Sequence, residues 1–206
     1  DREIPVWDRR IYGDLIDILT AAHAAAVAVD IVFQYKSYVE NDKSLIAAVK
    51  NAKNVLSPVI LNPMEKWEKG NKNIQINQGI ENPGILMQPQ IMKKGNPIIA
   101  GEDILPFKEL LDTSWGIGHI NCDADNDGIN RTFPLFIRSR EQPEMFYPSL
   151  TFRMVLDHLG ITGENIEIYF GQKIILKDAH ISATEKRDIE IPIDNRGRMI
   201  INWVGP

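Results

Sequence analysis

The chain has 206 residues, 44% of them hydrophobic and 25% charged, and it carries a formal net charge of -5 at pH 7. This composition is that of a globular protein and excludes a disordered chain, and the length favours a single domain over residues 1–206. The acidic net charge without a basic run argues against nucleic acid as a partner, and the single cysteine, Cys122, excludes an internal disulfide.

Helical and strand patterns alternate in the first part of the chain. Residues 8–24 have the spacing of an amphipathic helix. The apolar positions of this helix, which we expect to face the core, are Ile11, Leu15, Ile18, Leu19 and Ala22. The short apolar run 25–33 is typical of a strand buried on both faces. A second helix over 41–52, capped by its first Asn or Asp, and a second strand over 54–61 complete a right-handed β-α-β unit.

Two features complicate this simple alternation. Pro58 lies inside the second predicted strand and indicates a bulge or an edge there. The following stretch, at about 62–103, is rich in glycine, proline and lysine, with weak strand patterns at 73–80 and 84–92. We expect this stretch to be a long insertion loop, because connections of this length inside a domain usually carry function or move.

The second half of the chain is richer in strands. Helical segments are predicted at 108–111 and, after a Tyr-Pro-Ser start, up to about residue 159. Short strands are predicted over 116–121, 131–139, 166–170, 173–176, 190–192 and 199–204. The predicted class is α/β: a mixed β-sheet flanked by helices in a three-layer-like arrangement, with antiparallel hairpins added in the C-terminal half.

An acidic stretch, 123–128, connects two of these strands. Its alternating carboxylates match the first half of a calcium-binding loop. The match then ends, because Pro134 stands where that loop needs a glutamate, and strands rather than helices flank it. We therefore predict a polar hairpin with a tight turn at Asp127 and Gly128, whose charge is offset by Arg131 and solvent. The alternative is a looser cation site, and its ligands would be Asp123, Asp125 and Asp127.

Asp30 stands alone in the first predicted strand. An unpaired buried carboxylate is costly, and ligands of open α/β sheets bind at the carboxyl ends of strands. Asp30 therefore either belongs to a pocket, or caps a helix, or pairs with an arginine. Among the histidines, none of which has zinc-ligand spacing, His119 is singled out because it adjoins the acidic stretch. The sequence holds no nucleophile elbow and no phosphate or dinucleotide loop, so no motif indicates an enzyme.

Six motifs occur in an order that is specific when taken together. The helix 8–24 and the strand 25–33 are followed by Gly-His-Ile-Asn at 118–121 and Asp-Gly-Ile-Asn-Arg at 127–131. Tyr-Pro-Ser-Leu at 147–150 comes next, and the closing segment runs from Ile-Pro-Ile-Asp to Trp-Val-Gly-Pro. Over nearly the whole chain this order resembles the second type of CHASE domain, with 62–103 as the least similar part.

The resemblance implies an extracytoplasmic sensory domain of a bacterial transmembrane receptor, which signals to a cytoplasmic cyclase or kinase module. It implies no catalytic residue and no cofactor. Its expected partners are a small-molecule or ion ligand, the receptor's own transmembrane helices, and a second copy in a homodimer. Asp30, Asn121, Asp127 and Arg131 match the family pattern, and we expect them near the ligand. Because no apolar run reaches the ~20 residues of a membrane span, the chain is expected to be a domain taken from a longer protein.

Two other functions stay open at this point. The first is a structural module that spaces membrane helices and pairs the subunits of the same receptor. The second is a divalent-metal-dependent hydrolase that uses the cluster of Asp123, Asp125 and Asp127, and it requires a tightly bound ion.

Overall fold

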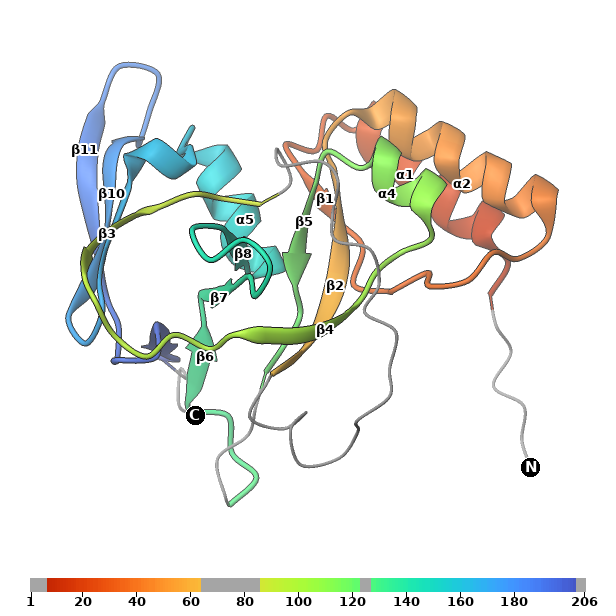
Figure 1. Cartoon of the computed structure of the whole chain (residues 1–206). Coiled ribbons are helices and arrows are strands. Elements are labelled where there is room, and N and C mark those ends of the chain that lie inside the picture. Colours follow the sequence, from red (N-terminus) through yellow and green to blue (C-terminus); the bar gives the residue numbers. More distant parts are fainter. Residues whose placement is uncertain (1–6, 64–85, 123–126, 203–206) are drawn as a thin grey trace.

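The computed structural model describes residues 7–63, 86–122 and 127–202, which form an α/β fold (Figure 1). The helices in these ranges are α1 (Arg9–Ala21), α2 (Val39–Ala52), α4 (Lys108–Thr113), α5 (Leu150–His158) and the 3-10 helix η2 (Gly163–Asn165). The strands are β1 (Val27–Ala28), β2 (Val55–Pro63), β3 (Gln90–Lys93), β4 (Ala100–Ile104), β5 (Gly116–His119), β6 (Thr132–Pro134), β7 (Phe136–Arg138), β8 (Phe146–Pro148), β9 (Ile166–Tyr169), β10 (Lys173–His180), β11 (Lys186–Pro192) and β12 (Arg198–Ile200).

Strand β2 is the centre of the first sheet. It pairs in parallel with β1, where Val27 lies opposite Val55, and with β5, where Leu56 lies opposite Gly116. Its second half pairs antiparallel with β4. The sheet is therefore mixed, and the predicted β-α-β connection between parallel strands is confirmed for β1, α2 and β2.

Pro58 lies in the middle of β2 without breaking a ladder hydrogen bond. Successive residues of a strand point their N–H and C=O groups to opposite sides, and the carbonyl of Leu56 faces β1, where Val29 N donates to it. Pro58 faces the same side. There β1 has ended at Ala28, and β4 begins to pair only at Ile60. The proline therefore occupies a gap between two partner strands, which is the local edge that its position predicted.

Helices cover both faces of this sheet (Figure 1). Helices α1, α2 and α4 lie on one face, where they share a core cluster with Val55 of β2. Helix α5 lies on the other face, because a side chain built at Gly116, the partner of Leu56, would meet Arg153 of α5. Adjacent residues of a strand point to opposite faces, so Val55 and Leu56 face different helical layers. The predicted three-layer arrangement is confirmed.

The C-terminal half adds strands that are mostly antiparallel. Strands β9, β10 and β11 pair antiparallel in sequence order, and β3 joins their edge parallel to β9. Strand β6 pairs with β12, and β7 pairs with β8. A large apolar cluster lies among these strands and α5, and it includes Phe136, Phe146, Phe152, Leu156, Ile166 and Ile174. The predicted antiparallel additions are confirmed.

Two stretches differ in secondary structure from the prediction. The strand expected over 25–33 is reduced to β1, because the chain after Val29 turns away toward Arg9 and Asp42. The stretch 62–103 is not one long loop, because its described part contains β3 and β4; residues 64–85 lie outside the described residues. The weak strand pattern at 84–92 overlaps β3, whereas β4 was not predicted. Each strand pairs with a distant segment, β3 with β9 and β4 with β2.

The acidic stretch does not close a hairpin. Strand β5, before it, pairs with β2, whereas β6, after it, pairs with β12, so the connection joins two different sheets. The local conformation is nevertheless as predicted, because Gly128 has a φ of 82°, in the region that favours glycine. All four residues of β5 are buried. The strand lies in the first sheet, where it pairs in parallel with β2, and it does not pair with β6. Residues 123–126, with Asp123 and Asp125, lie outside the described part of the chain.

The first two helices form as predicted but differ in detail. Helix α1 begins after Asp8, whose side chain accepts a hydrogen bond from Arg10 N. Its core side consists of Tyr12, Ile16 and Leu19. Of the predicted stripe only Leu19 faces the core, whereas Ile11, Leu15 and Ile18 are exposed. Helix α2 begins at Val39, before the expected Asn or Asp cap. Asp42 is therefore a buried residue inside the helix and not its cap. Its carboxylate accepts hydrogen bonds from Arg9 and from Ser37 N instead.

Candidate functional site

A groove with a volume of about 1190 Å³ lies beside α5. Its floor is made of the buried side chains Leu86, Met87, Pro89, Met145 and Ile161. Its rim is polar and includes Gln88, Gln142, Glu144, Glu164 and the half-exposed ring of Trp115. An apolar floor with a few polar groups at the edge is the usual make-up of a small-molecule site.

The groove depends on how closely α5 approaches β5. A side chain at Gly118 would lie only 2.4 Å from the Cα of Leu150, so only glycine lets the helix start here. Ser149 caps this start, because its Oγ accepts a hydrogen bond of 3.2 Å from Phe152 N. One turn further on, Gly116 leaves room for the guanidinium of Arg153, which a side chain would meet at 3.0 Å. Glycines of β5 therefore place Arg153 in the wall of the groove.

In the part of the groove lining that the structure describes, Arg153 is the one cation. Its Nε donates to both carboxylate oxygens of Asp157, at 2.9 and 3.1 Å, and the two side chains are 9% and 22% exposed. Glu144 and Glu164 add two further carboxylates, so the described lining holds three acidic groups and one guanidinium. Among the described residues, the side-chain polar atoms of Gln88, Glu144 and Glu164 make no hydrogen bond to the protein. The lining is therefore acidic and has free acceptors at its rim.

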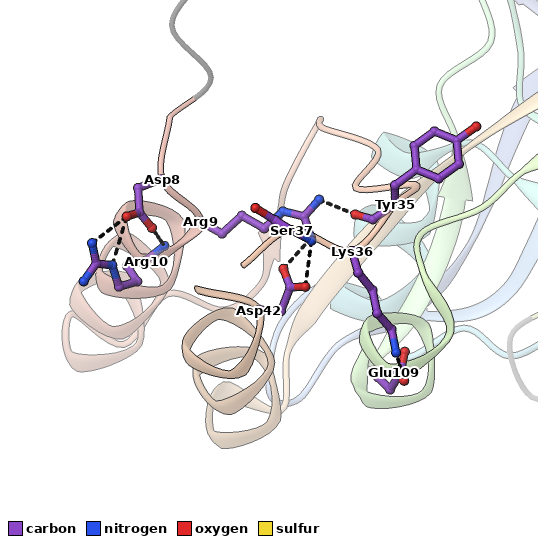
Figure 2. Close-up of polar contacts among 8 residues, drawn as sticks. All are labelled: Asp8, Arg9, Arg10, Tyr35, Lys36, Ser37, Asp42 and Glu109. Atoms are coloured by element: carbon purple, nitrogen blue, oxygen red, sulfur yellow. Dashed lines mark hydrogen bonds and ion pairs between the residues drawn. The ribbon is translucent and has the colours of Figure 1, made fainter. Parts of the chain in front are cut away.

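A second hollow, of about 840 Å³, lies where α1 begins. Its wall is the segment 31–37 together with Trp7, Arg9 and Tyr12. Figure 2 shows how Arg9 reaches across from α1: it pairs with Asp42 of α2 at 2.5 Å and donates to the carbonyl of Tyr35. Because its two cationic side chains, Arg9 and Lys36, are already engaged in ion pairs with Asp42 and Glu109, this hollow has less charge to offer a polar ligand than the groove at α5.

The same polar cluster holds the segment 31–37 in place. Asp42 accepts a hydrogen bond of 2.8 Å from Ser37 N, and Lys36 pairs with Glu109 of α4 (Figure 2). The Arg9 guanidinium also lies over two aromatic rings, with its Cζ 5.0 Å from the centre of Phe33 and 5.2 Å from that of Phe107. This region is therefore a structural joint between three helices.

The structure separates the site residues that the sequence suggested. Asp30 is exposed and follows β1, so the argument from a costly buried carboxylate does not apply to it. The side chain of Asn121 accepts from Leu61 N at 2.9 Å and donates to Leu61 O, and it thereby replaces a strand partner at the end of β2. Asp127 and Arg131 do meet: they form a two-pronged ion pair at 2.9 and 2.6 Å.

The ion pair of Asp127 and Arg131 lies at the surface. The two side chains are about half exposed, and the hydrogen bonds from Arg131 lower the pKa of the Asp127 carboxyl. The expectation that Arg131 offsets the charge of this turn is thus confirmed for Asp127. Within the described residues, no three His, Cys, Asp or Glu side chains are arranged to hold a metal ion. The cation site at Asp123, Asp125 and Asp127 stays a prediction.

His119 is fully buried beside the acidic connection. Neither ring nitrogen has a hydrogen-bond partner among the described residues, and the centre of the ring lies 6.1 Å from that of Phe133. Burial lowers the pKa of His119 from 6.5 to about 3, so the ring is neutral at physiological pH. The residue that the sequence singled out therefore belongs to the core.

None of the four predicted site residues lines the groove at α5, and its key residues were missed. Arg153 and Asp157 stand four residues apart in a predicted helix, a spacing that brings their side chains together. That local signal was present in the sequence. The contribution of Trp115 and of the segments around Gln88 and Glu164 depends on long-range packing, which the sequence pattern does not show.

Comparison with known protein families assigns the chain to a family. The family model of the CHASE2 domain matches residues 2–206, which is essentially the whole chain. No curated protein and no solved structure shows significant similarity to it. Among the described residues, no helix is both long and apolar enough to cross a membrane.

Proposed function

The chain belongs to the CHASE2 domain family of extracytoplasmic sensory domains, and from this we propose that it is the ligand-binding domain of a bacterial transmembrane receptor. In this proposal the domain signals to a cyclase or kinase module on the cytoplasmic side of the membrane. Sensing requires a site for a ligand and a physical connection from that site to the rest of the receptor. The observation that supports the first requirement most is the groove at α5, with its apolar floor, polar rim and buried Arg153–Asp157 pair.

The lining restricts the class of ligand. Three carboxylates against one guanidinium disfavour an anion, because like charges at short range repel and a desolvated anion needs its own partners. The free amide and carboxylate oxygens at the rim accept hydrogen bonds from hydroxyl or amino groups. The exposed ring of Trp115 offers a flat apolar surface to the same ligand. We therefore propose a small polar solute that is neutral or positively charged.

The connection from the groove to the receptor runs through packed elements. Helix α5 lies directly on β5 and β2, β2 pairs with β1, and β1 follows α1. A ligand that holds Arg153 and Trp115 in one arrangement favours the matching position of α5 on the sheet. The response is then a shift between two arrangements of the domain, and it requires that the ligand bind one of them more tightly.

A thermal-shift screen tests this function. A ligand at 100 times its Kd stabilises the folded state by about 2.7 kcal/mol, which raises the melting temperature by roughly 5–10 °C for a domain of this size. We expect such shifts from neutral or cationic polar metabolites and not from anionic ones. The shift should be lost in Trp115→Ala and Asp157→Asn.

Trp7→Ala is the matched control, because Trp7 is as exposed as Trp115 but lines the hollow at α1. It should keep the full thermal shift. A ligand whose effect survives in both groove variants and disappears in Trp7→Ala would move the binding site to that hollow. A response confined to anions would contradict the proposed ligand class.

A further inference from the structure

Helix α1 has apolar side chains on two sides, and only one of them is covered. Tyr12, Ile16 and Leu19 pack into the core of the helical layer. Ile11, Leu15 and Ile18 point outward and are 46%, 51% and 64% exposed. Large apolar residues exposed in a row are unusual for a monomer surface and indicate an interaction.

The spacing of these residues indicates what kind of partner fits. Ile11, Leu15, Ile18 and Ala22 follow one another at intervals of four, three and four residues, which is the seam of a two-stranded coiled coil. We call these four residues the outer stripe. A helix with this pattern is best matched by another helix with the same pattern. In the described residues, α2 and α5 each expose only one large apolar side chain, Val39 and Val155, so neither has such a seam.

We propose that the outer stripe of α1 pairs in parallel with the outer stripe of a second copy of this chain. Such a contact uses the same surface on both copies, as the interface of a two-fold symmetric dimer does. The proposal goes beyond the sensory function and does not rest on the groove, which lies beside α5 on the other face of the sheet.

The size of the surface agrees with a weak dimer. Together with the adjoining Trp7, the outer stripe exposes on the order of 400 Å² of apolar side chain per copy, which is within the range of a functional surface patch. Two copies together bury about 800 Å², which is below the ~1,200–2,000 Å² of a stable specific interface and in the range of weak, transient contacts. The isolated domain is therefore expected to associate weakly. Two domains held at one membrane surface associate more strongly, because tethering raises their effective concentration.

Charge disfavours a lipid surface as the alternative partner. Asp14 and Asp17 are exposed along one flank of the outer stripe, and the whole chain has a formal net charge of -5. Amphipathic helices that lie on membranes carry lysine and arginine on the polar face instead, because the lipids are anionic. Contact with a second copy of the chain does not require lysine or arginine, because the residues that meet in the outer stripe are apolar.

The heptad positions of the flanking residues bear on the orientation of the pair. With Leu15 and Ala22 at the a positions of the heptad and Ile11 and Ile18 at d, Asp14 falls at a g position and Leu19 at an e position. In a parallel pair, Asp14 of one copy lies beside Leu19 of the other. In an antiparallel pair that keeps the four seam positions in contact, Asp14 would face Ala21 of the other copy, so charge alone does not decide the orientation. The parallel orientation follows instead from the two-fold symmetry of two receptor chains that enter the same membrane in the same direction.

Cysteine cross-linking of the 206-residue chain tests both the surface and the orientation. The exposed Cys122 is first replaced in a Cys122→Ser background. In a parallel pair, every seam position meets its own copy within reach of a disulfide, so Leu15→Cys and Ile18→Cys should both form covalent dimers on mild oxidation. Asp17→Cys, on the same helix but off the seam, is the control and should remain monomeric. Cross-linking at only one seam position would overturn the parallel orientation, and cross-linking no stronger than the control would overturn the dimer.

Sedimentation over a range of protein concentrations gives an independent test. Leu15→Glu should raise the dimer dissociation constant by at least about tenfold, since it places two carboxylates in the seam. Its melting temperature should not fall, because Leu15 is half exposed in the single domain. Val155→Glu, equally exposed but on α5, should leave association unchanged. Binding of the wild-type chain to phosphatidylcholine vesicles that Leu15→Glu abolishes, without any dimer, would assign the stripe to a lipid surface and overturn the proposal.

Discussion

Arg9 links parts of the chain that lie far apart in the sequence. Its guanidinium pairs with Asp42, donates to the carbonyl of Tyr35 and lies over the rings of Phe33 and Phe107. The side chains of Arg9 and Asp42 are only 12% and 9% exposed, so each carries a charge that water cannot compensate. The pair therefore stabilises the joint between the first helices only while both partners are present.

The first prediction concerns this pair. Asp42→Ala leaves a buried guanidinium without its carboxylate and should lower the free energy of unfolding by about 3–5 kcal/mol, measured by chemical denaturation. The double variant Arg9→Met/Asp42→Leu should lose less than Asp42→Ala, because no buried charge is left unpaired. Equal losses in the single and the double variant would show that packing, and not charge, holds this joint.

The second prediction concerns the pH dependence of stability at His119. Burial lowers its pKa from 6.5 to about 3 in the folded state, so between these values the unfolded chain binds a proton that the folded chain does not. The stabilisation is complete above pH 6.5 and is lost as the pH falls toward 3. Its contribution to the slope approaches about 1.4 kcal/mol per pH unit.

His119→Phe removes this group and keeps a ring beside Phe133, so its unfolding free energy should fall less steeply with acid than that of the wild type. The comparison uses the slope of the unfolding free energy against pH, so a difference in absolute stability between the two proteins does not affect it. Denaturant unfolding at several pH values measures both slopes. His158→Gln, at an exposed position of α5, is the control. Identical slopes in wild type and His119→Phe would mean that the buried ring gains a proton at little cost.

At the scale of elements, the contact between α5 and β5 governs the groove. The two glycines of β5 differ in what a side chain would meet: backbone atoms of Leu150 at Gly118, and the mobile end of Arg153 at Gly116. Backbone cannot move aside without shifting the helix, whereas a guanidinium can. The strand therefore holds α5 in place at Gly118 and only shapes the wall at Gly116.

From this difference we predict that Gly118→Ala lowers the free energy of unfolding by about 1–3 kcal/mol or more, and that Gly116→Ala costs clearly less. Gly116→Ala should instead displace Arg153 and weaken ligand binding in the groove. Chemical denaturation of both variants, with calorimetry of the ligand, checks the two effects separately. A Gly118→Ala domain as stable as Gly116→Ala would show that α5 is not held by close backbone contact.

Much of the element order follows from local patterns in the sequence, and the errors arise where long-range pairing decides. The caps and spacing of α1 and α5 are local, so both helices were predictable. The spacing in α1 does not tell which of two apolar sides faces the core, because both have the same period. Likewise, Asp127 and Gly128 specify a turn, but the pairing of β5 with β2 and not with β6 is a long-range contact that this turn does not determine.

The candidate site was less predictable than the fold for the same reason. Asn121 has the chemistry of a ligand-binding residue, yet it satisfies the backbone of Leu61 at the end of β2. Asp30 is marked by its apolar neighbours in the sequence, but the strand that would bury it ends at Ala28. The groove at α5 is assembled from segments that meet only in the folded chain, and Arg153 with Asp157 is its one part visible as a local pair.

At the scale of the whole molecule, the groove is the proposed ligand site and the outer stripe is the proposed dimer contact. The groove lies beside α5, which packs between the first sheet and the C-terminal strands, and the outer stripe lies on α1 in the layer beyond that sheet (Figure 1). The sheet of β1, β2, β4 and β5 connects them. In the proposed receptor, the solute binds on one side of this sheet and the second copy on the other, so a movement of α5 can change the relation between the two copies.

The most direct test of the sensory proposal is to map where a stabilising solute binds. In two-dimensional NMR spectra of the isotope-labelled chain, titration with such a solute should shift the indole signal of Trp115 and the side-chain amide signals of Gln88 and Gln142. The indole of Trp7 should stay in place. Shifts at Trp7 and around Tyr35, with the signals of the groove unchanged, would contradict the account.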